Sequence, residues 1–151
     1  MRMEGSFVVS APRETVWRRI KDPALLASCI PGCRKIEMLS PTSYRAEVAI
    51  SVGPVKADFH LVVEVSKEEP PERILSTTRG EEGTRASILS ADNVVSLADL
   101  GDGRTEVSYS SEVSITGRLG KFGLGMMKKK AEALGEEFAA AFREKIGERI
   151  A

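Results

Sequence analysis

The residues of this chain best suited to metal or redox chemistry are its two cysteines, Cys29 and Cys33, which flank a Pro31-Gly32 pair. Redox motifs and zinc knuckles usually place two cysteines two residues apart, and a structural zinc needs further Cys or His ligands. Here three residues separate the thiols, and His60 is the single histidine of the sequence. We therefore expect no metal site and interpret the cysteines as free thiols that pack as small hydrophobic groups.

The rest of the sequence offers no set of residues arranged for catalysis. It contains no Ser-His-Asp set, no phosphate-binding loop and no paired histidines, so we assign no catalytic residue. Gly120, Gly123 and Gly125 resemble a nucleotide-binding fingerprint but lack its preceding parallel strand and its acidic residue. Asp92 and Asn93 interrupt an apolar strand. The pattern favours a β-bulge or a solvent-facing pair, and the alternative is a role in orienting a ligand head group within a cavity.

Length and composition indicate a single domain that spans residues 1–151. The 22 basic and 22 acidic residues cancel, which argues against nucleic acid as a partner, and an aromatic content of 5% is low for base stacking. No signal peptide is visible, and no apolar run is long enough to cross a bilayer. With two free cysteines, these features predict a cytoplasmic protein.

The elements that position these residues follow from hydrophobic periodicity. An opening strand at residues 7–9 precedes two short helices at 13–20 and 22–28. Apolar and polar residues then alternate, as in an antiparallel sheet with one face in solvent. The strands located by this alternation are 44–51, 55–65, 73–80, 86–100 and 105–115. After Gly117 the period becomes that of a helix, which ends near Ile150.

This order predicts an α+β fold in which a strongly curved antiparallel sheet of about seven strands surrounds a long C-terminal helix. The apolar faces of sheet and helix bury each other. One helix does not fill the whole concavity, so we expect a cavity between them; a solid core is the alternative. The residues expected to line the cavity are Val48, Ile50, Phe59, Leu61, Val63, Phe122, Met126, Met127 and Leu134.

The order of elements resembles the helix-grip fold of START domains and the birch-pollen allergen family. Three stretches also resemble the CoxG family, which is named for carbon monoxide dehydrogenase. They are residues 29–33, residues 53–57, and residues 117–120 leading into the last helix. The Val16-Trp17 pair early in the first helix also fits. The resemblance covers nearly the whole chain, and the Cys-Ile-Pro-Gly-Cys stretch is its most specific part.

The resemblance implies a non-catalytic accessory protein with a hydrophobic cavity and no covalently bound cofactor. Family members are associated with molybdenum-containing carbon monoxide dehydrogenases and related hydroxylases, whose subunits are therefore the expected protein partners. The implied ligand is a lipophile, in particular a quinone such as menaquinone that accepts the enzyme's electrons. Membrane recruitment of the enzyme is the other implied role, which would place the protein at the inner face of the membrane.

Two further expectations concern the glycines and lysines near the last helix. Glycine allows the backbone to move, so the corner between the cysteines and the start of the last helix are expected to gate the cavity. The expected gate residues are Ile30, Pro31, Gly32, Gly120 and Gly123. Apolar residues at 122–127 precede lysines at 128–130, a pattern typical of peripheral membrane contact or of a solvated helical face.

Two alternatives to a ligand-binding accessory protein stay open. A cyclase or hydratase would use the same cavity for catalysis and would need an acid or base that faces inward. The alternation places Asp58, His60 and Glu64 on the outer face, which disfavours this interpretation. A ligand-free assembly factor would bind a partner protein and no small molecule.

Overall fold

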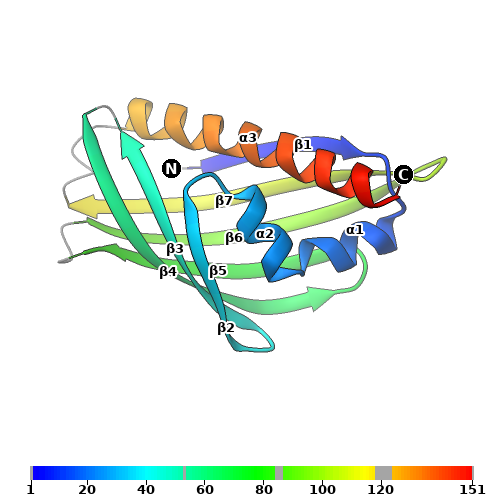
Figure 1. Cartoon of the computed structure of the whole chain (residues 1–151), viewed down its shortest axis with the longest axis horizontal. Helices are drawn as coiled ribbons and strands as arrows, with labels where there is room; N and C mark the ends of the chain where they lie inside the picture. Colours follow the sequence, from blue (N-terminus) through cyan, green and yellow to red (C-terminus); the bar gives the residue numbers. More distant parts are fainter. Residues whose placement is uncertain (1, 53, 84–86, 118–123, 151) are drawn as a thin grey trace.

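A computed structural model describes residues 2–52, 54–83, 87–117 and 124–150 (Figure 1). In chain order the elements are β1 (Arg2–Val9), α1 (Arg13–Ile20), α2 (Pro23–Cys29), β2 (Cys33–Ser40), β3 (Ser43–Val52), β4 (Val55–Glu69), β5 (Arg73–Glu82), β6 (Ser87–Gly101), β7 (Arg104–Gly117) and α3 (Leu124–Ile150). Within these ranges, seven strands form one antiparallel sheet in the order β1-β7-β6-β5-β4-β3-β2. The predicted α+β architecture is confirmed.

The periodicity located every strand except β2, which lies at one edge of the sheet. Two register shifts interrupt its pairing with β3, one between Cys33 and Lys35 and one between Met38 and Ser40. Most of its side chains are exposed. A shifted, exposed edge strand does not show the clean alternation of a strand with one buried face, so periodicity alone does not reveal it.

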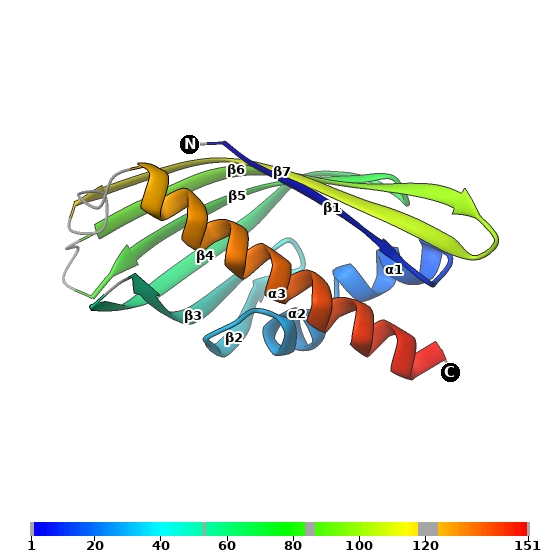
Figure 2. The ribbon, with the colours of Figure 1, turned by 90° about the horizontal axis from the view of Figure 1, so that it is seen from above.

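The long helix α3 crosses the concave face of the sheet (Figure 2). It contacts β1 at one edge of the sheet, β3 near the other edge, and α2 on the side away from the sheet centre. The sheet curls around the helix because both bury apolar faces that neither covers alone. Within the described residues, no helix combines the length and the apolar character needed to cross a membrane.

The two short helices are held in place by local signals. The Asp22 side chain accepts hydrogen bonds from the backbone N–H groups of Ala24 (3.0 Å) and Leu25 (3.4 Å), which caps α2. After α2 the chain turns at Gly32, which has a φ of +80°. The Gly32 carbonyl then accepts a hydrogen bond from the Ala49 N–H (2.9 Å), so the corner is tied to β3.

Two groups of buried side chains occupy opposite ends of the concave face. The large core surrounds the end of α3 and consists of Phe7, Val9, Ala11, Val16, Trp17, Leu25, Cys29, Leu97, Val107, Ala139, Phe142 and Ile146. The small core lies under the start of α3. It consists of Ala57, Phe59 and Met127, with Ile50, Leu61, Leu89 and Ile115 packed against it. The middle of the concave face lies between these two cores.

Candidate ligand-binding site

A cavity of about 470 Å³ lies in the middle of the concave face, between the large core and the small core. Its floor is formed by β4 to β7, and its other walls come from α1, α2, α3 and the β2–β3 hairpin. The apolar side chains that line it are Phe7, Ile20, Pro23, Leu26, Ile30, Met38, Pro41, Val63, Val65, Ile74, Val95, Val107 and Phe138. A mostly apolar wall of this size is typical of a small-molecule site.

The cavity stays open partly because α3 has no side chain at Gly135, which lines it. Tyr109 of β7 occupies part of the space that two missing side chains leave. Its ring crosses Gly5 on β1, and its hydroxyl would stand 2.8 Å from a Cβ added at Gly135. Neither glycine could carry a side chain without displacing this ring. Tyr109 therefore reaches from the sheet to the helix and forms one wall of the cavity.

A row of polar side chains crosses the apolar floor of the cavity. Asn93 of β6 is paired directly with Ser76 of β5 on one side and with Ser111 of β7 on the other. The Asn93 amide nitrogen donates to the Thr78 hydroxyl (3.0 Å), and it lies 3.4 Å from the Ser76 hydroxyl and 3.5 Å from the Ser76 carbonyl oxygen. The Ser111 hydroxyl donates to the Asn93 amide oxygen at 2.7 Å. We refer to these four half-buried residues as the polar row.

Asp92 and Asn93 do not form the bulge or the solvent-facing pair that the sequence favoured. The β6 register is regular through both positions, so the two side chains point to opposite faces of the sheet. Asp92 is exposed on the outer face, whereas Asn93 lines the cavity.

The mouth of the cavity lies between the joint of α1 and α2, the β2–β3 turn and the end of β4, where the exposed lining residues gather. Lys21 and Glu68 form an ion pair there, with 2.6 Å between Nζ and Oε1. A register shift between Val65 and Lys67 changes the alternation of β4, so Glu68 falls on the concave side. Lys21 also lies over the Trp17 ring, 5.6 Å from its centroid.

Tyr44 of β3 brings a phenol to the cavity wall. Burial raises the pKa of this hydroxyl, and the nearby Cys33 thiol raises it further. The Tyr44 hydroxyl is therefore fully protonated at neutral pH and is available as a hydrogen-bond donor.

The structure divides the residues that the sequence assigned to the cavity wall. Val63 lines the cavity. Phe59, Met127, Ile50 and Leu61 instead belong to the small core. Their strands and helix were placed correctly, but side chains at this end of the concave face fill the space completely. The ligand-binding roles of these residues stay predictions.

The remaining predicted lining residues lie elsewhere. Val48 is buried, Leu134 is half-buried, and Met126 is 48% exposed; none of them is among the lining side chains. Met126 faces solvent because the adjacent Met127 takes the inward position on α3. Phe122 lies outside the described residues.

Among the expected gate residues, Ile30 lines the cavity at the end of α2. Pro31 and Gly32 form the neighbouring turn but are not among the lining side chains. Gly120 and Gly123 lie outside the described residues. The described mouth is formed by the α1–α2 joint and the β2–β3 turn, and a gating role for any of these residues stays a prediction.

Sequence reasoning missed Ser76, Thr78 and Ser111. The signal was present, because Ser111 falls on the apolar register of β7 between Tyr109 and Val113. Asn93 interrupts the apolar register of β6 in the same way. Polar residues at the inward positions of neighbouring strands meet in one row once the strands are paired, and this pairing cannot be read from either strand alone.

Other candidate chemistry is not brought together. Cys29 is buried in the large core and Cys33 is half-buried; both thiols are free. Over the described ranges, no group of three or more His, Cys, Asp or Glu residues is arranged to hold a metal ion. Asp58, His60 and Glu64 are exposed on the outer face. Asp58 pairs with Arg34, and His60 lies beside Glu47.

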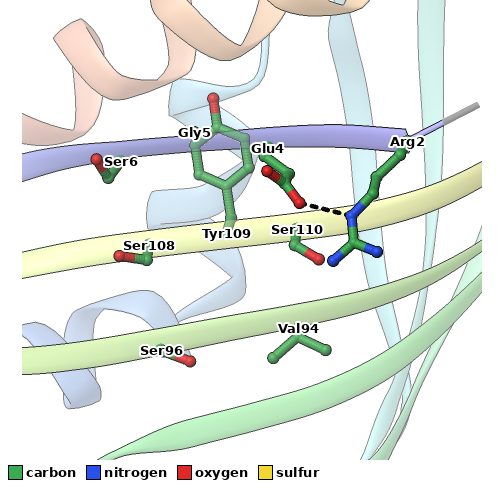
Figure 3. A pocket seen from close by; sticks show the side chains of 9 residues that line it. All are labelled: Arg2, Glu4, Gly5, Ser6, Val94, Ser96, Ser108, Tyr109 and Ser110. Carbon is green, nitrogen blue, oxygen red and sulfur yellow. Dashed lines mark hydrogen bonds and ion pairs between the residues drawn. The ribbon is translucent and has the colours of Figure 1, made fainter.

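A second hollow, of about 610 Å³, lies across β1, β7 and β6 and is widely open to solvent (Figure 3). Its side chains are mainly short and hydroxylated, and Arg2 forms an ion pair with Glu4 at one end. The residues around it are Arg2, Glu4, Gly5, Ser6, Val94, Ser96, Ser108, Tyr109 and Ser110. It lacks the apolar enclosure of the cavity, so the cavity is the stronger candidate for a small-molecule site.

The fold and the cavity define a START-like helix-grip protein with a hollow centre. The chain belongs to the carbon monoxide dehydrogenase CoxG family, whose model matches residues 5–147. Family and fold together indicate an accessory role that involves ligand binding. No curated protein matches the chain in sequence.

Solved structures with the same fold include three that align over nearly their whole length. A conserved protein from Geobacillus kaustophilus has a TM-score of 0.90 and 26% identity, covering 98% of this chain and 96% of that chain. A START superfamily protein from Mycobacterium smegmatis has a TM-score of 0.78 and 17% identity, with 99% of each chain covered. The Zhui aromatase/cyclase from Streptomyces sp. R1128 has a TM-score of 0.72 and 17% identity, covering 100% of this chain and 96% of that chain. At 17% identity the last two show the fold alone.

Proposed function

We propose that this protein is a non-catalytic accessory protein that binds one lipophilic small molecule in the cavity, and that this molecule is a quinone such as menaquinone. The observation that carries the proposal is an apolar cavity of about 470 Å³ crossed by a single polar row. Its volume falls within the roughly 300 to 1,000 Å³ common for small-molecule sites.

Apolar burial supplies most of the binding free energy in such a site. A ligand that buries about 300 Å² of apolar surface gains about 7 kcal/mol at 25 cal/mol per Å², before the cost of association is subtracted. The polar row then favours ligands that can hydrogen-bond to it, because covering it with a pure hydrocarbon would leave polar groups without partners. A quinone satisfies both requirements, since it joins an apolar ring and tail to two carbonyl acceptors.

The charges at the cavity argue against a fatty acid or another anionic lipid. Lys21 and Glu68 are the charged lining residues of the described part, and they pair with each other at the mouth. An incoming carboxylate would have to compete with Glu68 for Lys21. A neutral head group enters without disturbing this pair.

The family supports a protein partner for this ligand carrier. Its name denotes a subunit of carbon monoxide dehydrogenase. We propose that the chain serves a molybdenum-containing hydroxylase of that type, by supplying the quinone that accepts its electrons or by bringing the enzyme to the membrane where quinones reside.

The enzyme alternative finds less support in the cavity. Beyond the Lys21–Glu68 pair, the ionisable lining residues of the described part are Tyr44 and Tyr109. The raised pKa of Tyr44 makes it a poorer base at neutral pH. The likeness to an aromatase/cyclase is one of fold, and catalysis by a cyclase would require groups that the described cavity does not present.

Titration with a short-tailed menaquinone, followed by the fluorescence of Trp17, tests the proposal. Trp17 is the single tryptophan of the chain, and Lys21 links its ring to the cavity mouth. We expect saturable quenching with one ligand per chain and a ligand-bound mass in native mass spectrometry. Val63→Phe, which points into the cavity, should abolish binding, whereas Val62→Phe on the 41% exposed neighbouring position should not. The absence of both quenching and a bound mass would overturn the proposal and favour a ligand-free assembly factor.

A further inference from the structure

We propose that the hydroxyl groups of Ser76 and Thr78, positioned by Asn93, form a subsite for a carbonyl oxygen of the bound ligand. The inference rests on the proposed ligand-binding function and adds where the head group lies and what it must carry. It places the head group at the centre of the sheet and directs the apolar remainder toward the mouth.

The orientation of the Asn93 amide is the first step. Its nitrogen lies 3.5 Å from the Ser76 carbonyl oxygen, which can only accept a hydrogen bond. If the amide were flipped, two acceptor oxygens would face each other at that position. The carbonyl therefore favours the orientation in which the Asn93 nitrogen points to β5 and its oxygen points to β7.

The amide orientation then fixes the directions of three hydroxyl protons. The Ser111 hydroxyl lies 2.7 Å from the Asn93 oxygen, an acceptor, so Ser111 donates its proton there. On the other side, the Asn93 nitrogen donates to Thr78 Oγ1 at 3.0 Å and lies 3.4 Å from Ser76 Oγ. These two oxygens receive hydrogen bonds, and in the described part of the chain neither hydroxyl proton has an assigned acceptor.

The polar row thus presents two adjacent donors on β5 rather than a mixture of donors and acceptors. Both Ser76 and Thr78 line the cavity, so their protons can reach a ligand. The matching chemical group is a neutral oxygen acceptor, such as the carbonyl of a quinone or another ketone. An amine or a hydrocarbon of equal size would leave both donors without a partner inside an apolar cavity, which costs affinity.

The neighbouring residues restrict where the rest of the ligand can lie. Toward the large core the next inward positions are Ile74, Val95 and Tyr109, and toward the small core they include Ala91 and Val113. Because the small core is filled, the open direction from the polar row leads past the first of these groups to the mouth. An isoprenoid or alkyl tail fits this direction.

The test compares two ligands that differ only in their oxygens. One is 2-methyl-1,4-naphthoquinone carrying a single prenyl group, and the other is the same carbon skeleton without the two carbonyl oxygens. We expect the quinone to bind about tenfold more tightly, as one to two hydrogen bonds to otherwise unpartnered donors would give. Thr78→Val keeps the side-chain shape and removes one donor, so it should weaken the quinone about fivefold and leave the hydrocarbon unchanged.

Matched variants keep the test independent of folding. Thr77→Val makes the same chemical change on the outer face of β5 and should alter neither affinity. Ser76→Ala removes the second donor and should reproduce the effect of Thr78→Val. If both ligands bind equally well, or if Thr77→Val and Thr78→Val behave alike, the subsite is overturned while the proposed function survives. If neither ligand binds, both fail.

Asn93 is a positioning residue in this scheme, and the infrared carbonyl stretch of the bound quinone reads its role. In the wild-type complex, hydrogen bonding should shift one carbonyl band to lower frequency. Asn93→Leu retains the Ser76 and Thr78 hydroxyls but no longer directs them, so the shifted band should broaden and move back toward its position in an apolar solvent. An unchanged band in Asn93→Leu would overturn the positioning role.

Discussion

The small core and the cavity occupy neighbouring parts of one concave face, yet one is filled and the other is hollow. Strands β4, β6 and β7 run through both. On β4, for example, Phe59 and Leu61 pack in the small core, and Val63 and Val65 line the cavity. The difference therefore does not come from the fold. It comes from which side chains the same strands carry over a distance of a few residues.

Helix α3 shows the same contrast along its own axis. Met127 fills the small core, whereas Gly135, two turns later and about 12 Å along the axis, leaves space above the cavity. Beneath Gly135 the floor carries the polar row, which an apolar side chain could cover only by leaving it without partners. A missing side chain above and hydrogen-bonded polar groups below keep this part hollow, so the cavity is a property of particular residues.

The largest expected effect comes from emptying the filled part. Phe59 is 1% exposed, and Phe59→Ala should lower the free energy of unfolding by about 3 to 5 kcal/mol. Phe138→Ala makes the same change at a half-buried ring that lines the cavity and stacks on Phe142 at 5.7 Å, and it should cost less than half as much. Urea unfolding of both variants measures the difference. Equal losses would show that the two regions are packed alike.

The corner at Gly32 gives the next largest effect and acts on the hollow side. Its φ of +80° disfavours any residue with a Cβ, and an added Cβ would also collide with the backbone oxygen of Ala49. Gly32→Ala should therefore cost at least about 2 kcal/mol. Because this corner fixes the end of α2, where Ile30 lines the cavity, ligand affinity should fall as well.

Gly103→Ala separates the two causes of this loss. Gly103 has a φ of +71° but no atom within 4 Å of an added Cβ. It should cost about 1 kcal/mol from backbone strain alone. Thermal unfolding of both variants gives the comparison. If Gly32→Ala costs no more than Gly103→Ala, the contact with Ala49 does not hold the corner.

The sequence predicts the fold well because its signals are local and repeated. Alternation over five strands and a helical period after Gly117 are averaged over many residues, so single exceptions do not hide them. The same averaging conceals the site. Ser111 and Asn93 look like isolated exceptions in their own strands, and only the pairing of β6 with β7 makes them neighbours.

The cavity wall was harder to predict for two physical reasons. The register shift in β4 changes which residues face inward after Val65, so continuing the alternation would place Glu68 on the wrong face. In addition, periodicity identifies an inward residue without telling whether it meets another side chain or a void. Phe59 and Val63 share one register on one strand, yet the first is packed and the second lines the cavity.

Enlarging one side chain in each region tests this division directly. Ala57 is 5% exposed within the small core, so Ala57→Leu should overpack it and cost about 1 to 3 kcal/mol. Val63→Phe adds apolar volume to a region that has room for it, so the free energy of unfolding should change by less than about 1 kcal/mol. Chemical denaturation without ligand measures both changes. A loss for Val63→Phe as large as that for Ala57→Leu would mean that the hollow part cannot accept a guest.

The smallest effect concerns Tyr44 on the cavity wall and appears only at high pH. Burial, followed by the nearby Cys33, raises the folded-state pKa of its phenol above the ordinary value of 10.0. The unfolded chain therefore releases this proton first, and the stability contributed by the neutral phenol is complete below pH 10. It is lost as the pH rises from 10 through the folded-state pKa. Tyr44→Phe should remove this contribution and give a flatter decline of the unfolding free energy above pH 10. Cys33→Ser, which removes only the second cause, should flatten it less. If wild type and Tyr44→Phe decline with equal slopes, the Tyr44 hydroxyl is as well solvated in the folded cavity as in the unfolded chain, and this part of the wall is open to water.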